Sequence, residues 1–412
     1  MNKSIKKQAI SAAILSMALT ACNESTTSTE GSDFSKDKDT QGDFNQSAMV
    51  TALTDNIITP TYQAFEEQSG IQSDAVAAYC EAEKLVSQQP NNRDQADEAL
   101  VNAQNKWRDA MNVWQQVEMM QMGPLLEQDG LLRNKIYSWP IVNTCAVDFD
   151  VTYYASGTVN GEPYDITKRT PTRKGMAALE YLLFNESLAH SCTGTSTPPG
   201  WDGLMEHEQR EARCEFAVEV SSDINNNAQV LISSWLADGG YANELKQAGE
   251  ANSIFETPHA AVNAISDAMF YLDSSTKDGK IATPAGILTN SCGLMPCPET
   301  VESKYSSHSL ANITYNLVAF EKLLTGDSGL GFTDYLLDEG DSATVEAMTG
   351  AVTKAKENIQ SQESSMQELL VNDASEVNAM HADVKEVTDK LKVDFINSLA
   401  LKLPATSAGD ND

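Results

Sequence analysis

The sequence has few basic residues, and none of its histidines belongs to a recognisable metal or catalytic motif. It contains 28 Lys and Arg against 59 Asp and Glu, a formal charge of -31. Such acidity argues against nucleic acid or an anionic lipid surface as a partner and weakly favours cationic ligands. HExxH, GxSxG, P-loop and GxGxxG patterns are all absent. Composition therefore points to no standard hydrolase or nucleotide site.

The apolar run at the N-terminus is too short for a stable membrane span. It covers Ile10 to Leu19, follows three lysines and ends in "LTAC". This ending resembles a bacterial lipobox, which implies a signal peptide over residues 1–21 and a lipid on Cys22. Asn23 follows the cysteine and, by the same resemblance, implies sorting to the outer membrane. We therefore expect a lipid-anchored periplasmic protein; the alternative is a simple secretory signal with a chance cysteine.

Large apolar residues are nearly absent from the segment that follows. Residues 22–46 are rich in Ser, Thr, Asp and Gly, so they cannot build a core and are predicted to form a flexible tether. The remaining length suits two helical domains, predicted over 47–245 and 250–405, with a Gly- and Ala-rich stretch between them. Residues 406–412 are predicted to be a disordered polar tail.

The periodicity of the folded part is helical, with one exception. Apolar residues recur at three- and four-residue steps over most of the chain, including 94–122 and 299–324. Residues 147–164 instead alternate, are rich in Val, Thr and Tyr, and contain Asn160-Gly161, a strong hairpin signal. The predicted fold class is all-α, with two helical bundles and a small β-hairpin insertion near 147–164.

Six cysteines remain when Cys22 is set aside, and an even number in an exported chain indicates disulfides. The sequence alone leaves the connectivity open. Spacing favours a small loop closed by Cys292 and Cys297, and it favours Cys192 with Cys214, which bracket a Pro- and Gly-rich loop. Cys80 and Cys145 are then left to pair. None of these cysteines has the Cys/His spacing of a zinc finger.

Two glutamates interrupt apolar helix faces. Glu180 lies inside "RKGMAALEYLLF", with no basic residue three or four positions away. Glu118 falls on the apolar stripe that contains Trp107. Inward-facing carboxylates of this kind build metal and cofactor sites in helical bundles. We therefore regard Glu118 and Glu180 as ligand or metal candidates near Trp107, with Arg108 or Arg173 balancing their charge. The alternatives are a buried Glu–Arg pair that only fixes packing, and a purely core role for Trp107.

A third candidate group lies in "ESKYSSHSLANITYNL". Glu302, Ser306 and Ser309 stand at positions i, i+4 and i+7 of a predicted helix and would share one face. Small hydroxyls in such a row either allow close helix packing or bind a buried polar group. Packing is the favoured interpretation, and His308 falls about one residue off that face.

Five stretches resemble the imelysin-like family of bacterial envelope proteins, in its branch of periplasmic lipoproteins. They are "WRDAMNVWQQVEMMQMGP", "YSWPIVNTCAVD", "RKGMAALEYLLF", "KIATPAG" and "ESKYSSHSLANITYNL", and they span nearly all of the mature chain. The resemblance implies two helical-bundle domains, a site between them and a link to iron uptake. It also brings a GxHxxE motif tied to a proposed metallopeptidase activity. Gly175 and Glu180 match that motif, but Ala177 stands at the His position, and a methyl group can neither ligate a metal nor carry a proton.

Together, the resemblance and the carboxylates favour a non-enzymatic lipoprotein that binds a small ligand between its helical domains. Iron or another divalent cation is the ligand candidate, and other iron-uptake proteins are the expected partners. A metal-dependent peptidase is one alternative; it needs three protein ligands, so His308 or His259 would have to join the glutamates. A structural or partner-binding role is the other, and it predicts neutralised glutamates and no cleft.

Overall fold

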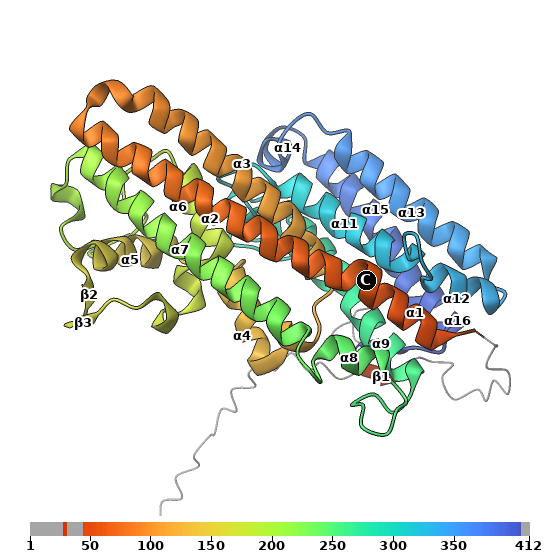
Figure 1. The fold of residues 1–412 in the computed structure, drawn as a ribbon. Coiled ribbons are helices and arrows are strands. Elements are labelled where there is room, and N and C mark those ends of the chain that lie inside the picture. The colour runs from red at the N-terminus through yellow and green to blue at the C-terminus, as the bar shows by residue number, and fades with distance from the viewer. Residues whose placement is uncertain (1–27, 31–43, 405–412) are drawn as a thin grey trace, which may run out of the picture.

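The computed structural model of the protein describes residues 28–30 and 44–404. The predicted signal peptide, the lipidation candidate Cys22, most of the predicted tether and the tail 406–412 lie outside these residues. Helices dominate the described part (Figure 1), which confirms the predicted all-α fold class. None of these helices combines the length and the apolar character that crossing a membrane requires.

Three long helices form the frame of the first half. α2 packs along both α3 and α7, and α1 leads into α2 through a π-helical turn at Thr54–Ile58 (Figure 1). The shorter helices α4, α5 and α6 pack on α7, and α8 packs on α1. The bounds are α1 Gln46–Leu53, α2 Thr59–Gln88, α3 Arg93–Glu118, α4 Glu127–Ile136, α5 Thr144–Ser156, α6 Gly175–Phe184, α7 Glu206–Trp235 and α8 Tyr241–Lys246.

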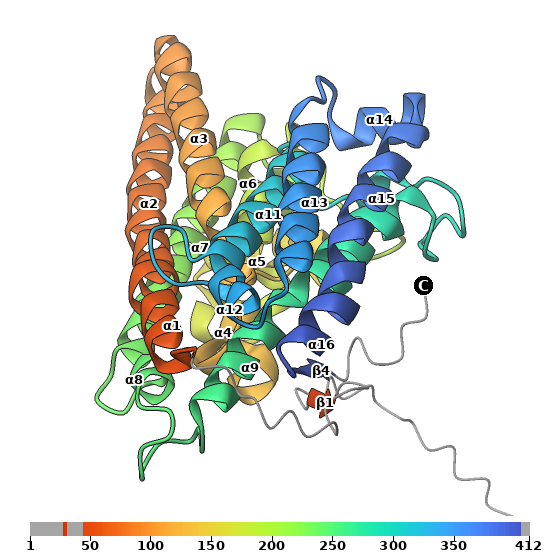
Figure 2. The same cartoon turned by 90° about the vertical axis from the view of Figure 1, so that its right-hand side faces the viewer.

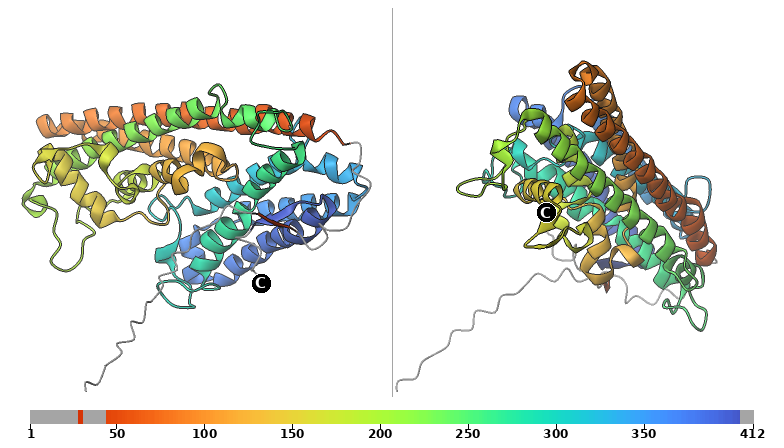
Figure 3. Two further views of the ribbon diagram at one scale, coloured as in Figure 1. Left: turned by 90° about the horizontal axis from the view of Figure 1, so that it is seen from below. Right: turned by 60° about the vertical axis from the view of Figure 1, so that its left-hand side comes forward.

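The second half forms another helical group around α11, α13 and α15. α11 lies between α3 and α13 and contacts both, so it joins the two groups (Figure 2). Seen from below, the two groups form two layers (Figure 3, left). The bounds are α9 Pro258–Met269, α10 Thr283–Ala285, α11 Ser309–Thr325, α12 Phe332–Asp338, α13 Ser342–Gln360, α14 Met366–Asn372, α15 Ala374–Lys390 and α16 Ile396–Ser398, with π-helical segments at Leu272–Ala282 and Leu391–Phe395.

The predicted hairpin is present but is shorter than 147–164. β2 (Thr158–Val159) pairs antiparallel with β3 (Glu162–Pro163) across Asn160-Gly161. The preceding residues belong to α5, because Val147 and Val151, four residues apart, are buried on one helical face. Gly157 then ends α5 in the left-handed conformation that favours glycine.

The folded part begins earlier than predicted. Ser28–Glu30 (β1) pairs antiparallel with Lys402–Pro404 (β4), so three residues of the predicted tether belong to a strand. The ring of Phe44 stacks on that of Tyr335, with centroids 4.6 Å apart. One hydrophobic core runs through both helical groups. The division into two domains near residues 245–250 stays a prediction.

Three disulfides are formed, and one of them, Cys292–Cys297, confirms the spacing argument. The other two predicted pairs are wrong. Cys80 bonds to Cys214 because α2 and α7 carry them and lie side by side. Cys145, at the start of α5, bonds to Cys192 in the loop after α6. Spacing along the chain could not reveal which helices are neighbours.

Candidate functional site

Glu118 closes α3 and is only 4% exposed. Its Oε2 accepts hydrogen bonds from the hydroxyl of Tyr271 at 2.7 Å and from the ammonium of Lys280 at 2.8 Å. Burial raises the pKa of Glu118, and the charge of Lys280 opposes that shift. The partner of this carboxylate is therefore a lysine from the second half of the chain.

Glu302 lies in the loop before α11 and is fully buried. Its Oε1 accepts from the hydroxyl of Tyr137 at 2.6 Å and from the amide of Gln115 at 3.2 Å, and lies 3.2 Å from Nζ of Lys280. Its Oε2 is buried without a hydrogen-bond partner among the described residues. A buried carboxylate oxygen without a hydrogen bond lowers the stability of the folded protein, and such oxygens are rare in native structures.

Lys280 connects these two glutamates. It is 1% exposed, and its ammonium also donates to Oδ1 of Asn316 at 3.0 Å and to Oε1 of Gln115. The rings of Tyr271 and Trp139 lie 5.3 and 5.9 Å from Nζ. Lys280 belongs to the π-helical segment Leu272–Ala282. π-Helical turns are rare and frequently mark functional sites.

Glu180 lies on α6 and faces the loop that contains Glu302. Its Oε1 accepts from the backbone N–H groups of Tyr305 at 3.0 Å and Ser306 at 2.9 Å, and from the Ser306 hydroxyl at 2.9 Å. It has no ion pair in the described part of the chain. Burial raises the pKa of Glu180 to about 7; these hydrogen bonds oppose the shift, and the charge of Glu302 adds to it.

Three carboxylates therefore gather where the two helical groups meet. Burial raises the pKa of Tyr137, and the charges of Glu302, Glu118 and Glu180 raise it further. We call Glu118, Glu180, Glu302 and Lys280 the glutamate cluster. Within the described residues, the hydrogen bonds to each carboxylate reach a single oxygen. The ammonium of Lys280 pairs with Glu118 and Glu302 but not with Glu180, so the cluster has two negative charges in excess when all three carboxylates are ionised.

The cluster has the donor chemistry of a hard-cation site but not the arrangement. Carboxylate oxygens suit cations such as calcium or iron. Across the described ranges, no three His, Cys, Asp or Glu side chains are placed to hold a metal ion. Lys280 also fills the space between Glu118 and Glu302. A metal ion therefore does not fit the cluster as it is arranged.

Three surface hollows, near α1 and the starts of α2 and α3, are lined by other residues.

The two arginines expected to balance the glutamates lie elsewhere, which corrects that expectation. Arg173 donates to Asp150 at 2.8 Å and to the carbonyl of Ala146 at 3.2 Å, since α5 offers it a buried carboxylate nearby. Arg108 lies over the ring of Phe184, 4.8 Å from its centroid. The balancing charge comes from Lys280 instead.

Two other candidates have packing roles. Trp107 is buried in the core, and its indole N–H donates to the carbonyl of Met176 at 3.0 Å. Gly175 opens α6 at φ +81°, and a Cβ there would lie 2.7 Å from the carbonyl oxygen of Ile136. This position needs glycine for conformation and close approach. Ala177, at the motif His position, is 6% exposed.

Glu302, Ser306 and Ser309 do not share a helical face, because α11 begins only at Ser309. They still contribute to one polar network: Ser306 donates to Glu180, and the Ser309 hydroxyl donates to the carbonyl of Glu302. The two hydroxyls therefore bind buried polar groups, whereas the favoured interpretation was packing.

Neither histidine that could revive a metal site contacts the glutamates. Nε2 of His308 lies 2.7 Å from Oδ1 of Asn112, and burial lowers the pKa of His308 to about 4. Nε2 of His259 lies 3.1 Å from the carbonyl oxygen of Ala400.

Five residues of the site were not predicted: Gln115, Tyr137, Tyr271, Lys280 and Asn316. Four of them stand in the stretches that carry the family resemblance. Gln115 lies in "WRDAMNVWQQVEMMQMGP", Tyr137 opens "YSWPIVNTCAVD", Lys280 opens "KIATPAG" and Asn316 lies in "ESKYSSHSLANITYNL". Tyr271 lies outside those stretches, and nothing local marks it. The resemblance was thus the available signal for the other four.

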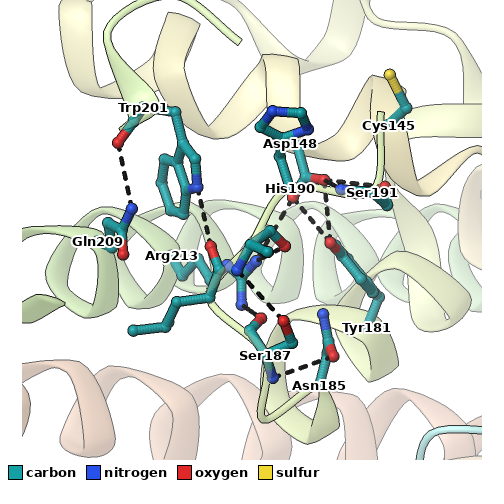
Figure 4. Close-up of polar contacts among 12 residues, drawn as sticks. Cys145, Asp148, Tyr181, Asn185, Ser187, His190, Ser191, Trp201, Gln209 and Arg213 are labelled. Atoms are coloured by element: carbon teal, nitrogen blue, oxygen red, sulfur yellow. Dashed lines mark hydrogen bonds and ion pairs between the residues drawn. The ribbon is translucent and has the colours of Figure 1, made fainter. Parts of the chain in front are cut away.

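A second buried polar cluster surrounds Asp148, beside the Cys145–Cys192 disulfide (Figure 4). The Tyr181 hydroxyl lies 3.0 Å from both carboxylate oxygens, and Ser191 donates through its N–H at 2.7 Å and its hydroxyl at 2.9 Å. Arg213 donates to two carbonyl groups of the same loop, those of Ser187 and Ala189. These contacts fix the loop after α6 against α5 and α7.

Comparisons with known proteins agree with this architecture. The model of the Imelysin family (peptidase M75) matches residues 58–393. A candidate iron-regulated protein A precursor from Parabacteroides distasonis ATCC 8503 is 18% identical with a TM-score of 0.64, over 86% of this chain and 94% of that one. An imelysin-like protein from Psychrobacter arcticum 273-4 is 14% identical with a TM-score of 0.59, over 88% and 98%. No curated protein matches the chain. Structural likeness at these identities shows the fold alone.

Proposed function

Because this chain belongs to the imelysin family, we propose that it is a non-catalytic lipoprotein of the bacterial envelope that acts in iron uptake by binding a small cationic ligand at the glutamate cluster. The link to iron uptake rests on the family resemblance and on the name of the Parabacteroides protein. The periplasmic location and the lipid on Cys22 rest on the N-terminal sequence, which lies outside the described residues.

The observation that carries the proposal is the imbalance of charge in the cluster. One ammonium pairs with two buried carboxylates, those of Glu118 and Glu302, and Oε2 of Glu302 is buried without a partner among the described residues. The third buried carboxylate, Glu180, adds a further negative charge when it is ionised. Uncompensated buried charge lowers stability, so a protein that retains it has a reason other than stability. A ligand that brings positive charge would neutralise the excess.

Lys280 indicates which chemistry the ligand carries. Its ammonium is held by carboxylate oxygens of Glu118 and Glu302 and by amide oxygens of Gln115 and Asn316. An ammonium group of a ligand would be held in the same way by the remaining carboxylate oxygens. Because a bare metal ion does not fit, iron would reach this protein within a compound that carries positive charge.

Two observations favour binding over hydrolysis. A catalytic metal site needs three protein ligands and an open position for water. Ala177 offers no ligand, and His308 is bound to Asn112. The buried side chains that remain can attract a cation but supply no activated nucleophile.

Calorimetric titration of the mature protein with 1,3-diaminopropane tests the proposal. The two ammonium groups of this probe match the two excess negative charges. The titration is carried out at about pH 8, about one unit above the pKa of Glu180, so that Glu180 is ionised. We expect saturable binding that weakens about tenfold or more in Glu180→Gln and Glu118→Gln. Glu98→Gln, an exposed change on the same helix α3, should bind like the parent.

Failure of the diamine to bind the parent would overturn the proposal. If both Gln variants were then as stable as the parent or more stable, a purely structural or partner-binding role would replace it. Ferric iron, ferrous iron, zinc and calcium form a second series with the same variants. We expect weak binding of these ions to the parent, because Lys280 lies where they would have to bind.

A further inference from the structure

The surroundings of Lys280 are those of a cation in an oxygen cage. Its Nζ lies 2.8 Å from Oε2 of Glu118, 3.2 Å from Oε1 of Glu302 and 3.0 Å from Oδ1 of Asn316, and it donates to Oε1 of Gln115. An ammonium has three N–H groups, so four oxygens exceed what it can satisfy with one straight hydrogen bond each. Carboxylate and amide oxygens are also the ligands that hard divalent cations take.

The fold holds Lys280 in this cage. The residue lies near the end of the π-helical segment Leu272–Ala282, and the neighbouring Gly279 packs so close to Trp139 that a Cβ would lie 3.2 Å from its ring. Asn316, on α11, has its amide oriented by the Thr276 hydroxyl at 3.0 Å and by the carbonyl of Gln115 at 2.7 Å. The Asn316 oxygen is thus positioned by contacts other than the one with the ammonium.

The cage also contains more acceptor oxygen than Lys280 uses. Oε2 of Glu302 is buried and has no partner within the described ranges, although Oε1 of the same carboxylate accepts from Tyr137 and Gln115. A buried carboxylate oxygen of this kind is one that a second cation, or a more highly charged one, would take as a ligand.

We propose that Lys280 is a resident cation that determines the specificity of the glutamate cluster: its ammonium keeps divalent metal ions out, and its removal turns the cluster into a divalent-cation site. The inference rests on the proposed function, because it assigns the selectivity of the same cluster. A divalent ion in place of the ammonium would draw on Glu118, Glu302 and the amide oxygens of Gln115 and Asn316. It would also lower the excess negative charge further than Lys280 does.

Replacement of Lys280 by Met in the full mature chain tests this inference, because Met keeps an apolar stem and removes the charge. The probe is Mn²⁺, titrated calorimetrically into parent and variant. We expect Lys280→Met to bind Mn²⁺ about tenfold or more tightly than the parent. Lys354→Met is the matched control: Lys354 also joins two carboxylates, those of Asp383 and Glu386 at 3.0 Å each, but at an exposed position on α13. It should leave Mn²⁺ affinity unchanged.

A second variant keeps the test decisive if Lys280→Met does not fold. Lys280→Met combined with Glu302→Gln retains the charge excess of the parent, and we expect it to fold and to bind Mn²⁺ more tightly than the parent. We also expect Mn²⁺ to raise the unfolding temperature of either variant but not that of the parent. Affinity for Mn²⁺ at or below the parent value in the folded variant overturns the inference.

The two proposals fail in different ways. Diamine binding to the parent without Mn²⁺ binding to the Lys280 variants would remove the role of Lys280 and leave the proposed function standing. Mn²⁺ binding to the variants without diamine binding to the parent would show that Lys280 has closed the cluster to ligands altogether. The specificity role would then stand, and the proposed function would fall.

Discussion

Replacement of Glu180 by Gln should remove a specific part of the dependence of stability on pH. Burial raises the pKa of Glu180 from its usual 4.5 to about 7. The folded chain therefore binds this proton more readily than the unfolded chain does. The contribution of Glu180 to the free energy of unfolding is fully present below about pH 4.5 and is lost as the pH rises through about 7. A difference of about two and a half pKa units corresponds to about 3 kcal/mol.

Gln is a close replacement, because its carbonyl oxygen can still accept from the N–H groups of Tyr305 and Ser306 while it carries no charge. Urea unfolding of parent and variant between about pH 4 and 8 measures the effect. The free energy of unfolding of the parent should fall relative to that of the variant by up to about 3 kcal/mol across this range. Other titrating groups, Glu118 among them, are present in both proteins, so the difference isolates Glu180.

Glu98→Gln provides the control, since Glu98 is exposed on α3. The free energy of unfolding of this variant should follow that of the parent at every pH. A difference between parent and Glu180→Gln that stays constant with pH would refute the reasoning. It would mean that the pKa of Glu180 is the same in the folded and the unfolded chain, because its three hydrogen bonds cancel the effect of burial.

Four further changes test the packing and the cross-links of the fold. Gly175→Ala should lower the free energy of unfolding by about 2 kcal/mol in denaturant titration, because it combines a φ of +81° with a 2.7 Å contact to Ile136; Gly203→Ala, where a Cβ meets nothing within 4 Å, should change it little. Loop-closure entropy predicts how much each disulfide contributes to the free energy of unfolding. Removal of Cys80–Cys214, which are 134 residues apart, should lower it by about 5 kcal/mol under non-reducing conditions, and removal of Cys292–Cys297 should lower it by about 2 kcal/mol. The reverse order would contradict this. Tyr181→Phe should cost about 1–3 kcal/mol in thermal unfolding, because the Asp148 carboxylate loses a buried donor, and an effect no larger than that of Tyr305→Phe would contradict this.

The helical fold and the burial of the two glutamates could be predicted because both are local properties. Glu118 follows Trp107 on the apolar stripe of α3, and that stripe is buried as the periodicity requires. Glu180 has no basic residue at helical spacing, which correctly implies that its partners come from elsewhere in the chain. What periodicity cannot supply is the identity of a distant partner: Lys280 is separated from Glu118 by 162 positions.

The failures have equally specific causes. Glu302 and Ser309 were assigned to one helix, but Ser303 and Ser307 adopt positive φ values of 51° and 55°, which break a helix before α11 begins. The alternation over 147–164 suggested strands throughout, yet burial of Val147 and Val151 against the core makes its first part helical. In each case long-range contacts outweigh the local pattern.

A crystal structure of the mature protein grown with 1,3-diaminopropane at about pH 8 tests the central claim most directly, because it locates the bound cation. We expect the diamine at the glutamate cluster, with its ammonium groups on carboxylate oxygens of Glu118, Glu180 or Glu302 that the protein leaves without donors. A structure with the diamine absent, or bound only at the surface while the cluster keeps Lys280 alone, would contradict it.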